Sequence, residues 1–236
     1  MFEKSAAYYD AIFGRRHDYR AETERLHRFI QANKRSRGNR LLDVACGTGS
    51  YLTQLRDSYQ VEGLDLSEAM LDVARQRVPD VPLHQGDLVD FKLERRFDAV
   101  VCLGSSIGYA RSVAGLRQAI QTFADHMVDG GAIVVEPWFP PGVWEPGRLT
   151  ADLVDEPDLK VARVLVSGVD DTGLVSTLDI HHLVAAPAGV ETFVERHELG
   201  LFTHAAYMAA FENAGLTVRH DPEGLIGRGM YVGAKG

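Results

Sequence analysis

The chain has 236 residues, of which 45% are hydrophobic and 25% are charged, as in one globular domain or one domain with an insertion. Its formal net charge of −8 argues against nucleic acid as the main partner, because phosphate backbones are bound through clustered lysine and arginine side chains. The sequence shows no apolar run near the roughly 20 residues that span a bilayer, and its first ten residues lack a secretion-signal pattern. We therefore expect a cytoplasmic protein with no membrane partner, whose cysteines, Cys46 and Cys102, are reduced and structural.

The first half of the chain predicts alternating helices and strands. Amphipathic patterns predict a helix over 19–32, one that begins after an N-cap at Ser67, and one over 112–127 that the DGG stretch at 129–131 ends. Between them lie short apolar runs bounded by Gly, Asp or Pro, as buried parallel strands are, at 40–45, 61–65, 81–84, 97–103 and 131–136.

The pattern changes after Pro137. The stretch PWFPPGVWEPG has four prolines in eleven residues and is incompatible with regular secondary structure. Short turns then separate expected antiparallel strands at 160–169, 174–185 and 191–201. A last helix, capped by Thr203, and strands near 216–220 and 229–234 complete the chain. We predict an α/β fold: a doubly wound, mostly parallel, seven-stranded Rossmann-like sheet formed by 1–137 and 202–236, with an antiparallel β insertion at 138–201 that covers the substrate site.

A glycine turn joins the first strand to a helix in LLDVACGTGSYLTQL, residues 41–55. Such a turn aims unpaired N–H groups at a ligand, and glycine lets the ligand approach the backbone. The third glycine of the dinucleotide pattern is missing, which disfavours a nicotinamide carrier. Three acids instead surround the turn: Asp43 near the end of the first strand, Asp65 at the end of the second and Asp87 after the third. This set suits a cationic ligand without pyrophosphate, such as S-adenosylmethionine. The alternative is that Asp43 only caps the turn and Asp65 is a solvated strand end.

The D-x-x-x-G-x-G stretch resembles the first motif of class I S-adenosylmethionine-dependent methyltransferases. The resemblance implies that Asp43 and the Gly47 backbone meet the methionine end, Asp65 the ribose, and Asp87 with the Leu88 backbone the adenine. It further implies that Leu103 flanks the purine or thioether and that Tyr19 closes over the cofactor. The complete set of expected cofactor residues is Tyr19, Asp43, Ala45, Gly47, Gly49, Asp65, Leu66, Met70, Gly86, Asp87, Leu88 and Leu103.

A narrower resemblance covers nearly the whole chain. The stretches SSIGY, VVEPWF, LFTHAAYMAAFENAGL and GRGMYVG, together with the glycine turn, look like the N,N-dimethyltransferases of TDP-linked amino sugars such as desosamine and mycaminose. That family dimethylates a sugar amine in antibiotic biosynthesis. The chain departs from the family at Gly104, Phe139 and GLIGRG, and has Phe2 where relatives tend to have tyrosine, all in the acceptor region.

The acceptor site is expected to combine cations for a pyrophosphate with flat side chains for a base or sugar. The candidate substrate residues are Phe2, Tyr9, Arg16, Ser106, Tyr109, Trp138, Phe139, Arg148, Arg163 and Arg228. Tyr109 and His181 are the candidate catalytic residues, Tyr109 because a phenol could orient the amine or relay a proton. No metal site is expected, and a homodimer is compatible with the sequence. A methyltransferase of another small acceptor, or a cofactor-binding subunit without turnover, stays an open alternative here.

Overall fold

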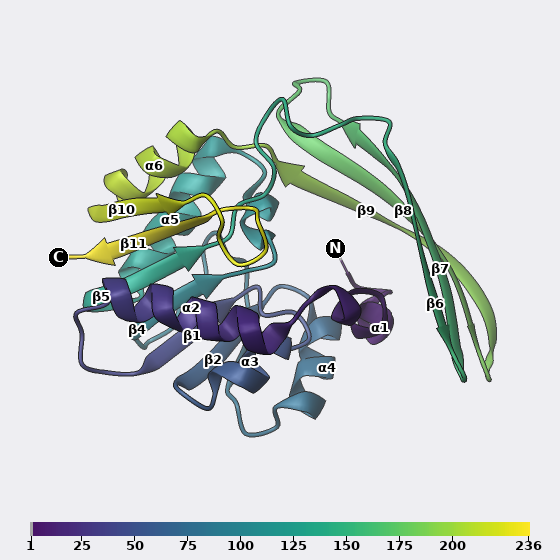
Figure 1. Cartoon of the computed structure of the whole chain (residues 1–236), viewed down its shortest axis with the longest axis horizontal. Helices are drawn as coiled ribbons and strands as arrows, with labels where there is room; N and C mark the ends of the chain where they lie inside the picture. Colours follow the sequence, from purple (N-terminus) through teal and green to yellow (C-terminus); the bar gives the residue numbers. More distant parts are fainter. Residues whose placement is uncertain (1) are drawn as a thin grey trace.

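The computed structural model describes residues 2–236 and contains two separate β-sheets. The larger sheet has the strand order β10–β11–β5–β4–β1–β2–β3 (Figure 1). Neighbouring strands among β1 to β5 are parallel, whereas β11 runs antiparallel to β5 and β10. The strand bounds are β1 Arg40–Val44, β2 Gln60–Asp65, β3 Leu83–Gln85, β4 Phe97–Cys102, β5 Met127–Val135, β10 Leu216–Asp221 and β11 Met230–Lys235. The predicted doubly wound sheet is confirmed, and its strand order reverses between β1 and β4, where such folds bind ligands.

Helices cover both faces of this sheet because successive strand residues point to opposite sides. Leu41 of β1 packs with Leu26, Ile30 and Leu55 of the helices on one face. The next residue, Leu42, packs in a second cluster with α5 and α6 on the other face (Figure 1). The helix bounds are α2 Tyr19–Asn33, α3 Ser50–Leu55, α4 Glu68–Arg77, α5 Val113–Asp125 and α6 His204–Asn213.

The predicted helix starts are confirmed by capping hydrogen bonds. Ser67 accepts a hydrogen bond from the Met70 amide, and Thr203 accepts one from the Ala206 amide. One helix end was wrong: α5 ends at Asp125, and the DGG stretch lies inside β5. Gly130 there has φ 74°, and the register between β4 and β5 shifts nearby, so the glycines form an irregularity within a strand instead of a helix stop.

The smaller sheet is antiparallel with the order β6–β7–β8–β9. Its strands are β6 Leu149–Glu156, β7 Leu159–Val169, β8 Val175–Ala186 and β9 Gly189–Gly200. The last three match the predicted strands. Strand β6 was missed, because its acidic residues and its place at the sheet edge give a weak apolar alternation. The sheet arches away from the strand ends of the larger sheet, as Figure 1 shows.

The N-terminal segment lies between the two sheets (Figure 1). It comprises the 3-10 turns Ala6–Tyr8 and Gly14–Arg16 on either side of α1, Tyr9–Phe13. Ile12 of α1 packs with Val154, Val161 and Val184 of the antiparallel sheet. Within the described residues, no helix is both long enough and apolar enough to cross a membrane.

Candidate active site

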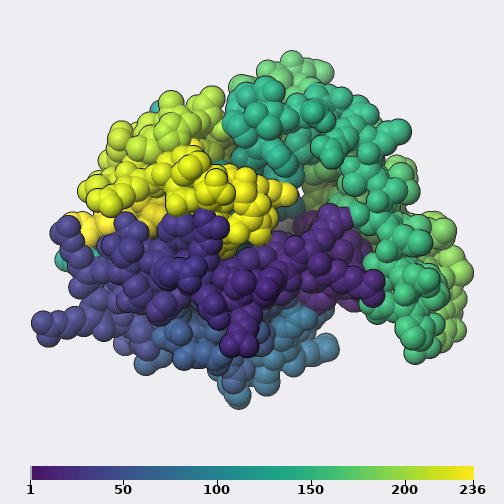
Figure 2. Space-filling view, viewed as in Figure 1, coloured from purple at the N-terminus to yellow at the C-terminus, as the bar shows by residue number. Residues whose placement is uncertain are grey.

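A cavity of about 860 Å³ lies between the carboxyl ends of the large-sheet strands and the inner face of the antiparallel sheet. The glycine turn lines one end, and the N-terminal segment, the 138–148 connection and strands β7 to β9 line the rest. Figure 2 shows the surface recess where the N-terminal segment, the C-terminal region and the antiparallel sheet meet. This volume and this mixed lining are typical of sites for small molecules.

The glycine turn is held open by Asp65. Its two carboxylate oxygens accept hydrogen bonds from the Gly47 amide at 2.8 Å and the Ser67 amide at 2.9 Å. Gly47 has φ 55°, and a Cβ built there would meet no atom within 4 Å, so the backbone faces open space in the cavity. A ligand can therefore lie directly on the turn.

Asp43, near the end of β1, has a buried carboxylate with an unpartnered oxygen. Its residue is 1% exposed, and its Oδ2 atom has no hydrogen-bond partner. Burial, and secondarily the nearby charge of Asp65, raise the pKa of Asp43 to about 8. A buried acid of this kind fits a cationic ligand over the turn, because the cation would stabilise its ionised form.

The cavity brings together most of the predicted cofactor residues and leaves out four. Gly49 caps α3 with φ 77°, and a Cβ there would lie 3.3 Å from the Ala74 Cβ, so this glycine allows two helices to approach. The Tyr19 ring packs 5.0 Å from the Tyr51 ring, outside the lining. Asp43 and Leu103 are buried and do not line the cavity, although Ala45 and Gly104, which follow them in the chain, do. The predicted residues that line the cavity are Ala45, Gly47, Asp65, Leu66, Met70, Gly86, Asp87 and Leu88.

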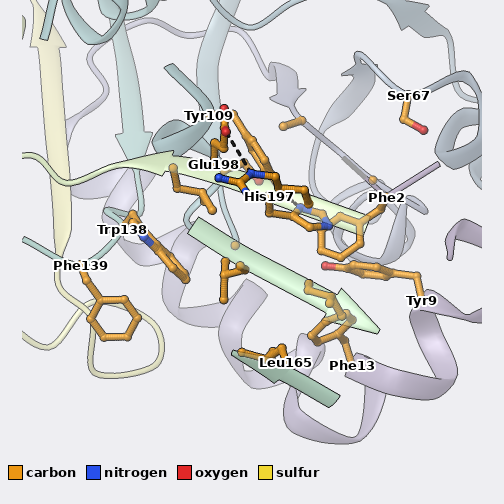
Figure 3. Close-up of a pocket in the computed structure, with 18 of the residues that line it drawn as sticks. Phe2, Tyr9, Phe13, Ser67, Tyr109, Trp138, Phe139, Leu165, His197 and Glu198 are labelled. Carbon is orange, nitrogen blue, oxygen red and sulfur yellow. Dashed lines mark hydrogen bonds and ion pairs between the residues drawn. The ribbon is translucent and has the colours of Figure 1, made fainter. Parts of the chain in front are cut away.

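Tyr109 and His197 meet at the cavity wall. The Tyr109 hydroxyl lies 2.7 Å from Nδ1 of His197, as the dashed line in Figure 3 marks. The Phe2 ring lies 4.3 Å from the imidazole, and Tyr9 packs 5.1 Å from Phe2. His197 was missed by sequence reasoning, although its place at an inward position of β9 would have been the signal for it.

The expectation for His181 was wrong. His181 is exposed on the outer face of β8, whereas Leu178 and Ile180 of the same strand line the cavity. Because side chains alternate along a strand, the neighbour His182 points inward. It is buried and stacks on Phe193 with ring centroids 4.6 Å apart, outside the cavity lining. Neither histidine of this pair therefore reaches the acceptor.

Two separate groups of cations line the cavity. Arg228 donates to the Ser105 hydroxyl at 2.9 Å, and its guanidinium stacks over Trp138 at 5.5 Å and Phe139 at 5.1 Å. Arg163 is buried and donates to Asp152 at 2.6 Å, and the same carboxylate pairs with Arg16. All the predicted acceptor residues that carry charge or aromatic rings line the cavity, namely Phe2, Tyr9, Arg16, Tyr109, Trp138, Phe139, Arg148, Arg163 and Arg228, as does Ser106.

Comparison with known proteins assigns the chain to a family. A methyltransferase-domain family model matches residues 41–131. The dTDP-3-amino-3,6-dideoxy-alpha-D-glucopyranose N,N-dimethyltransferase of Streptomyces fradiae is 42% identical over 98% of this chain and 91% of its own length. The chain belongs to the dTDP-amino-sugar N,N-dimethyltransferase family. Within this family, the dTDP-3-amino-3,4,6-trideoxy-alpha-D-glucopyranose N,N-dimethyltransferase of Streptomyces venezuelae is also 42% identical, over 95% of both chains.

Solved structures of the family agree with this fold. The crystal structure of DesVI from Streptomyces venezuelae has a TM-score of 0.87 at 41% identity and covers 95% of this chain and 94% of its own. The S-adenosylmethionine-bound structure of CalS10, an amino pentose methyltransferase from Micromonospora echinaspora, has a TM-score of 0.84 at 37% identity and covers 98% of this chain and 97% of its own. The chain is therefore an S-adenosylmethionine-dependent methyltransferase, and the expectation of this cofactor is confirmed.

The residues present fit this cofactor. The unpartnered Oδ2 of Asp43 complements a cation, and the bare backbone at Gly47 leaves room for a ligand. Asp65 and Asp87 bring carboxylates to the ends of β2 and β3. Among residues 2–236, no group of three or more His, Cys, Asp or Glu side chains is arranged to hold a metal ion.

Proposed function

We propose that this enzyme methylates the amino group of a TDP-linked amino deoxysugar, in two rounds, within antibiotic sugar biosynthesis. The observation that carries the proposal is the 42% identity to two such dimethyltransferases across both sheets, including the antiparallel insertion that walls the acceptor end of the cavity. The relatives that are 42% identical act on 3-amino sugars, and one that is 37% identical acts on a 4-amino sugar. The position of the amine on the sugar is therefore left open in the proposal.

The cofactor, when bound, supplies a methyl group already activated on a sulfonium. The chain has to hold the amine in line with that methyl group and exclude water. In this proposal the glycine turn, with Asp43 and Asp65 around it, holds the donor end. Phe2, Tyr9 and the Tyr109 hydroxyl border the opposite wall, where the amine would lie. The cavity has room for both ligands because it continues from Gly47 to the 138–148 connection.

The nucleotide end of the substrate would lie against the cations and aromatic rings. Arg228 is the best candidate for the pyrophosphate, because Ser105 and two aromatic faces hold its guanidinium while it lines the cavity. Arg163 is the weaker candidate, since Asp152 already neutralises it. Arg148 is exposed at the cavity rim, and Trp138 and Trp144, with ring centroids 5.3 Å apart, offer flat surfaces for the base or sugar.

Mass spectrometry of reaction products tests the proposal. The enzyme is incubated with S-adenosylmethionine and a panel of TDP-linked 3-amino and 4-amino deoxysugars, the matching free amino sugars, and a TDP-sugar with hydroxyl groups only. We expect one and then two methyl additions on one or more TDP-amino sugars. Methylation of the hydroxyl sugar, or equal turnover of the free amino sugars, would contradict the assignment of acceptor class.

We further propose that the protein forms a homodimer through the outer face of the antiparallel sheet. Seven large apolar side chains are exposed on this face, which no other part of the described chain covers: Leu149, Leu153, Val164, Val166, Leu183, Val190 and Val194. Contiguous apolar patches on soluble proteins commonly mark interfaces, and a two-fold dimer would cover the same patch on both copies. Light scattering during size-exclusion chromatography should give a dimer mass, and Leu153→Asp should give a monomer. A monomeric wild type would refute this interface.

Two broader expectations also belong to this proposal. A cytoplasmic location is proposed because nucleotide-linked sugars and S-adenosylmethionine are metabolites of the cell interior. The division into residues 1–137 with 202–236 and an insertion at 138–201 is proposed because each part has its own sheet. The N-terminal segment belongs to the first part by sequence, yet Ile12 packs in the apolar cluster of the insertion.

A further inference from the structure

The hydrogen bond between Tyr109 and His197 joins two elements that are distant in the sequence. Tyr109 lies on the 3-10 turn Ser106–Ala110 that follows β4, whereas His197 lies on β9 of the antiparallel sheet. Their 2.7 Å contact is at the cavity wall, with Tyr109 partly open to the cavity and His197 only 2% exposed (Figure 3). The antiparallel sheet thus touches the strand ends of the larger sheet through this pair at the place where the acceptor amine is proposed to lie.

The direction of this hydrogen bond decides what the phenol offers to the cavity. Burial lowers the pKa of His197 to about 3 and raises the pKa of Tyr109 well above its usual value, so both side chains are neutral near pH 7. A neutral imidazole has one acceptor nitrogen and one N–H. Either the phenol donates to Nδ1 and Nε2 carries the hydrogen, or Nδ1–H donates to the phenolic oxygen.

The aromatic surroundings of the imidazole favour the phenol as the donor. His197 Nε2 is buried without a hydrogen-bond partner, and the ring nearest to the imidazole is that of Phe2, at 4.3 Å. An N–H beside an aromatic ring is partly compensated by the π electrons, whereas a lone pair there gains nothing. In the opposite arrangement the phenol would donate into the cavity and would bind the lone pair of an amine, which is the nucleophile of the methyl transfer.

We propose that His197 is a positioning residue whose Nδ1 accepts the Tyr109 hydroxyl, so that the phenolic oxygen accepts an N–H of the acceptor amine and leaves the amine lone pair free for the methyl donor. This inference rests on the proposed function. The primary amine and the secondary amine formed in the first round both carry an N–H, so the same contact serves both rounds. The tertiary amine, once deprotonated, has no N–H left, and its release would be favoured.

His197 does not act as the proton acceptor in this arrangement. Moving a proton through the phenol to Nδ1 would create a buried imidazolium, which the surroundings disfavour. The amine therefore has to bind as the free base or lose its proton to solvent. The charged and titratable groups around the pair come from five elements and do not reverse this: Tyr9 on α1, Asp65 on β2, Arg163 on β7, His182 on β8 and Glu195 on β9.

Binding and kinetic measurements on four single variants and one double variant test the proposal. His197→Leu removes the acceptor nitrogen, His197→Asn keeps an acceptor oxygen near the position of Nδ1, and Tyr109→Phe removes the hydroxyl. The chain offers a matched control, because the Tyr59 hydroxyl lies 3.0 Å from His27 Nδ1 at a site outside the cavity lining. Tyr59→Phe removes an equivalent hydroxyl. Calorimetry measures the affinity of each enzyme, loaded with S-adenosylhomocysteine, for the TDP-amino sugar and for TDP alone.

We expect Tyr109→Phe and His197→Leu to weaken TDP-amino sugar binding about 3- to 10-fold, the usual effect of one lost hydrogen bond. The affinity for TDP alone should not change, and His197→Asn should recover most of the loss. The Tyr109→Phe/His197→Leu double variant should be no weaker than either single variant, because both act on one contact. Tyr59→Phe should behave as wild type. The acidic limb of the pH profile of kcat/KM should stay in all variants, since it reports the amine itself.

Several results would overturn the proposal. These are wild-type binding by His197→Leu, additive losses in the double variant, no recovery in His197→Asn, or loss of the acidic limb in His197→Leu, which would make His197 a base. If His197→Leu fails to fold, His197→Asn and Tyr109→Phe still decide, because equal losses in these two contradict the proposal. Failure of the proposed function is a separate result: the wild type would then neither bind nor methylate any TDP-amino sugar.

Discussion

Replacement of Asp43 by asparagine should stabilise the cofactor-free enzyme at alkaline pH and weaken cofactor binding. The substitution keeps the size of the side chain and removes its charge. The folded enzyme holds the Asp43 proton more tightly than the unfolded chain does, because the pKa is about 8 in the fold and 3.8 in the reference state. Unfolding therefore releases a proton between these pH values, and the wild type should lose stability as the pH rises from about 4 to about 8.

The magnitude follows from the two pKa values. Each pKa unit is worth about 1.4 kcal/mol, so the stability that the wild type loses through Asp43, relative to low pH, is about 2 kcal/mol at pH 5 and about 5 kcal/mol at pH 8. Solvent screening reduces these free energies little, because Asp43 is 1% exposed. An asparagine amide with incomplete partners costs about 1–3 kcal/mol at either pH. Between pH 5 and pH 8 the wild type should therefore lose about 3 kcal/mol of unfolding free energy that Asp43→Asn keeps.

Urea unfolding of the cofactor-free proteins at pH 5, 6.5 and 8 measures this difference directly. Calorimetry supplies the second half of the test. Cofactor binding to the wild type should tighten from pH 6 to pH 8 and should release close to one proton at pH 7, because the cation favours ionised Asp43. The variant should bind about 10-fold or more weakly at pH 8, without this proton release. A pH-independent stability difference, together with equal proton release in both proteins, would refute the reasoning.

Three further predictions concern other parts of the cavity. Arg228→Ala should raise the KM for a TDP-sugar more than it lowers kcat, and Arg228→Lys should not restore it, because a lysine cannot stack on both rings; equal kinetics on TDP-sugar and free sugar would contradict this role. Gly47→Ala should weaken cofactor binding at least 10-fold in calorimetry at a cost of about 1 kcal/mol in stability, whereas Gly142→Ala, also at positive φ and with open space around it, should leave binding intact. Asp10→Asn should remove the 2.5 Å ion pair with Arg77 and the contact with Thr48, loosening the N-terminal segment by about 1 kcal/mol; limited proteolysis near the N-terminus should quicken, and an unchanged cleavage rate would exclude such an anchoring role.

The sequence predicted the larger sheet well because its parallel strands are buried on both faces. Runs such as 97–103, in which Asp98 is the one charged residue, are then almost wholly apolar and bounded by turn residues, which leaves little ambiguity. The ligand class of the turn at Gly47 could also be predicted, because the missing third glycine and the three acids distinguish S-adenosylmethionine from a nicotinamide carrier. Strand β6 was not predicted because its polarity does not match its two faces: Leu149 and Leu153 are exposed on the outer face, whereas Asp152 lies on the inner face beside Arg163.

The acceptor site was only partly predictable, for a geometric reason. Its residues come from segments that are far apart in the sequence, and only the fold brings Tyr109 to His197. The choice between His181 and His182 on one strand also depended on which face the strand turns inward, and an error of one residue reverses that choice. The two adjacent histidines in a strand predict that one points inward, but they do not indicate that a third histidine, His197 on the next strand, lines the cavity.

The position of the N-terminal segment has a practical consequence for chimeric enzymes. Lys4 and Ser5 donate their amides to Glu195 of β9, and the Tyr8 hydroxyl donates to Glu191, so this segment is fastened to the insertion that follows it by more than a hundred residues. If residues 138–201 were replaced by those of a relative with another sugar preference, the grafted sheet would lack the N-terminal segment that it contacts in its own protein. Transplanting acceptor preference between such enzymes should therefore require the first sixteen residues to travel with the insertion, while the donor half stays in place.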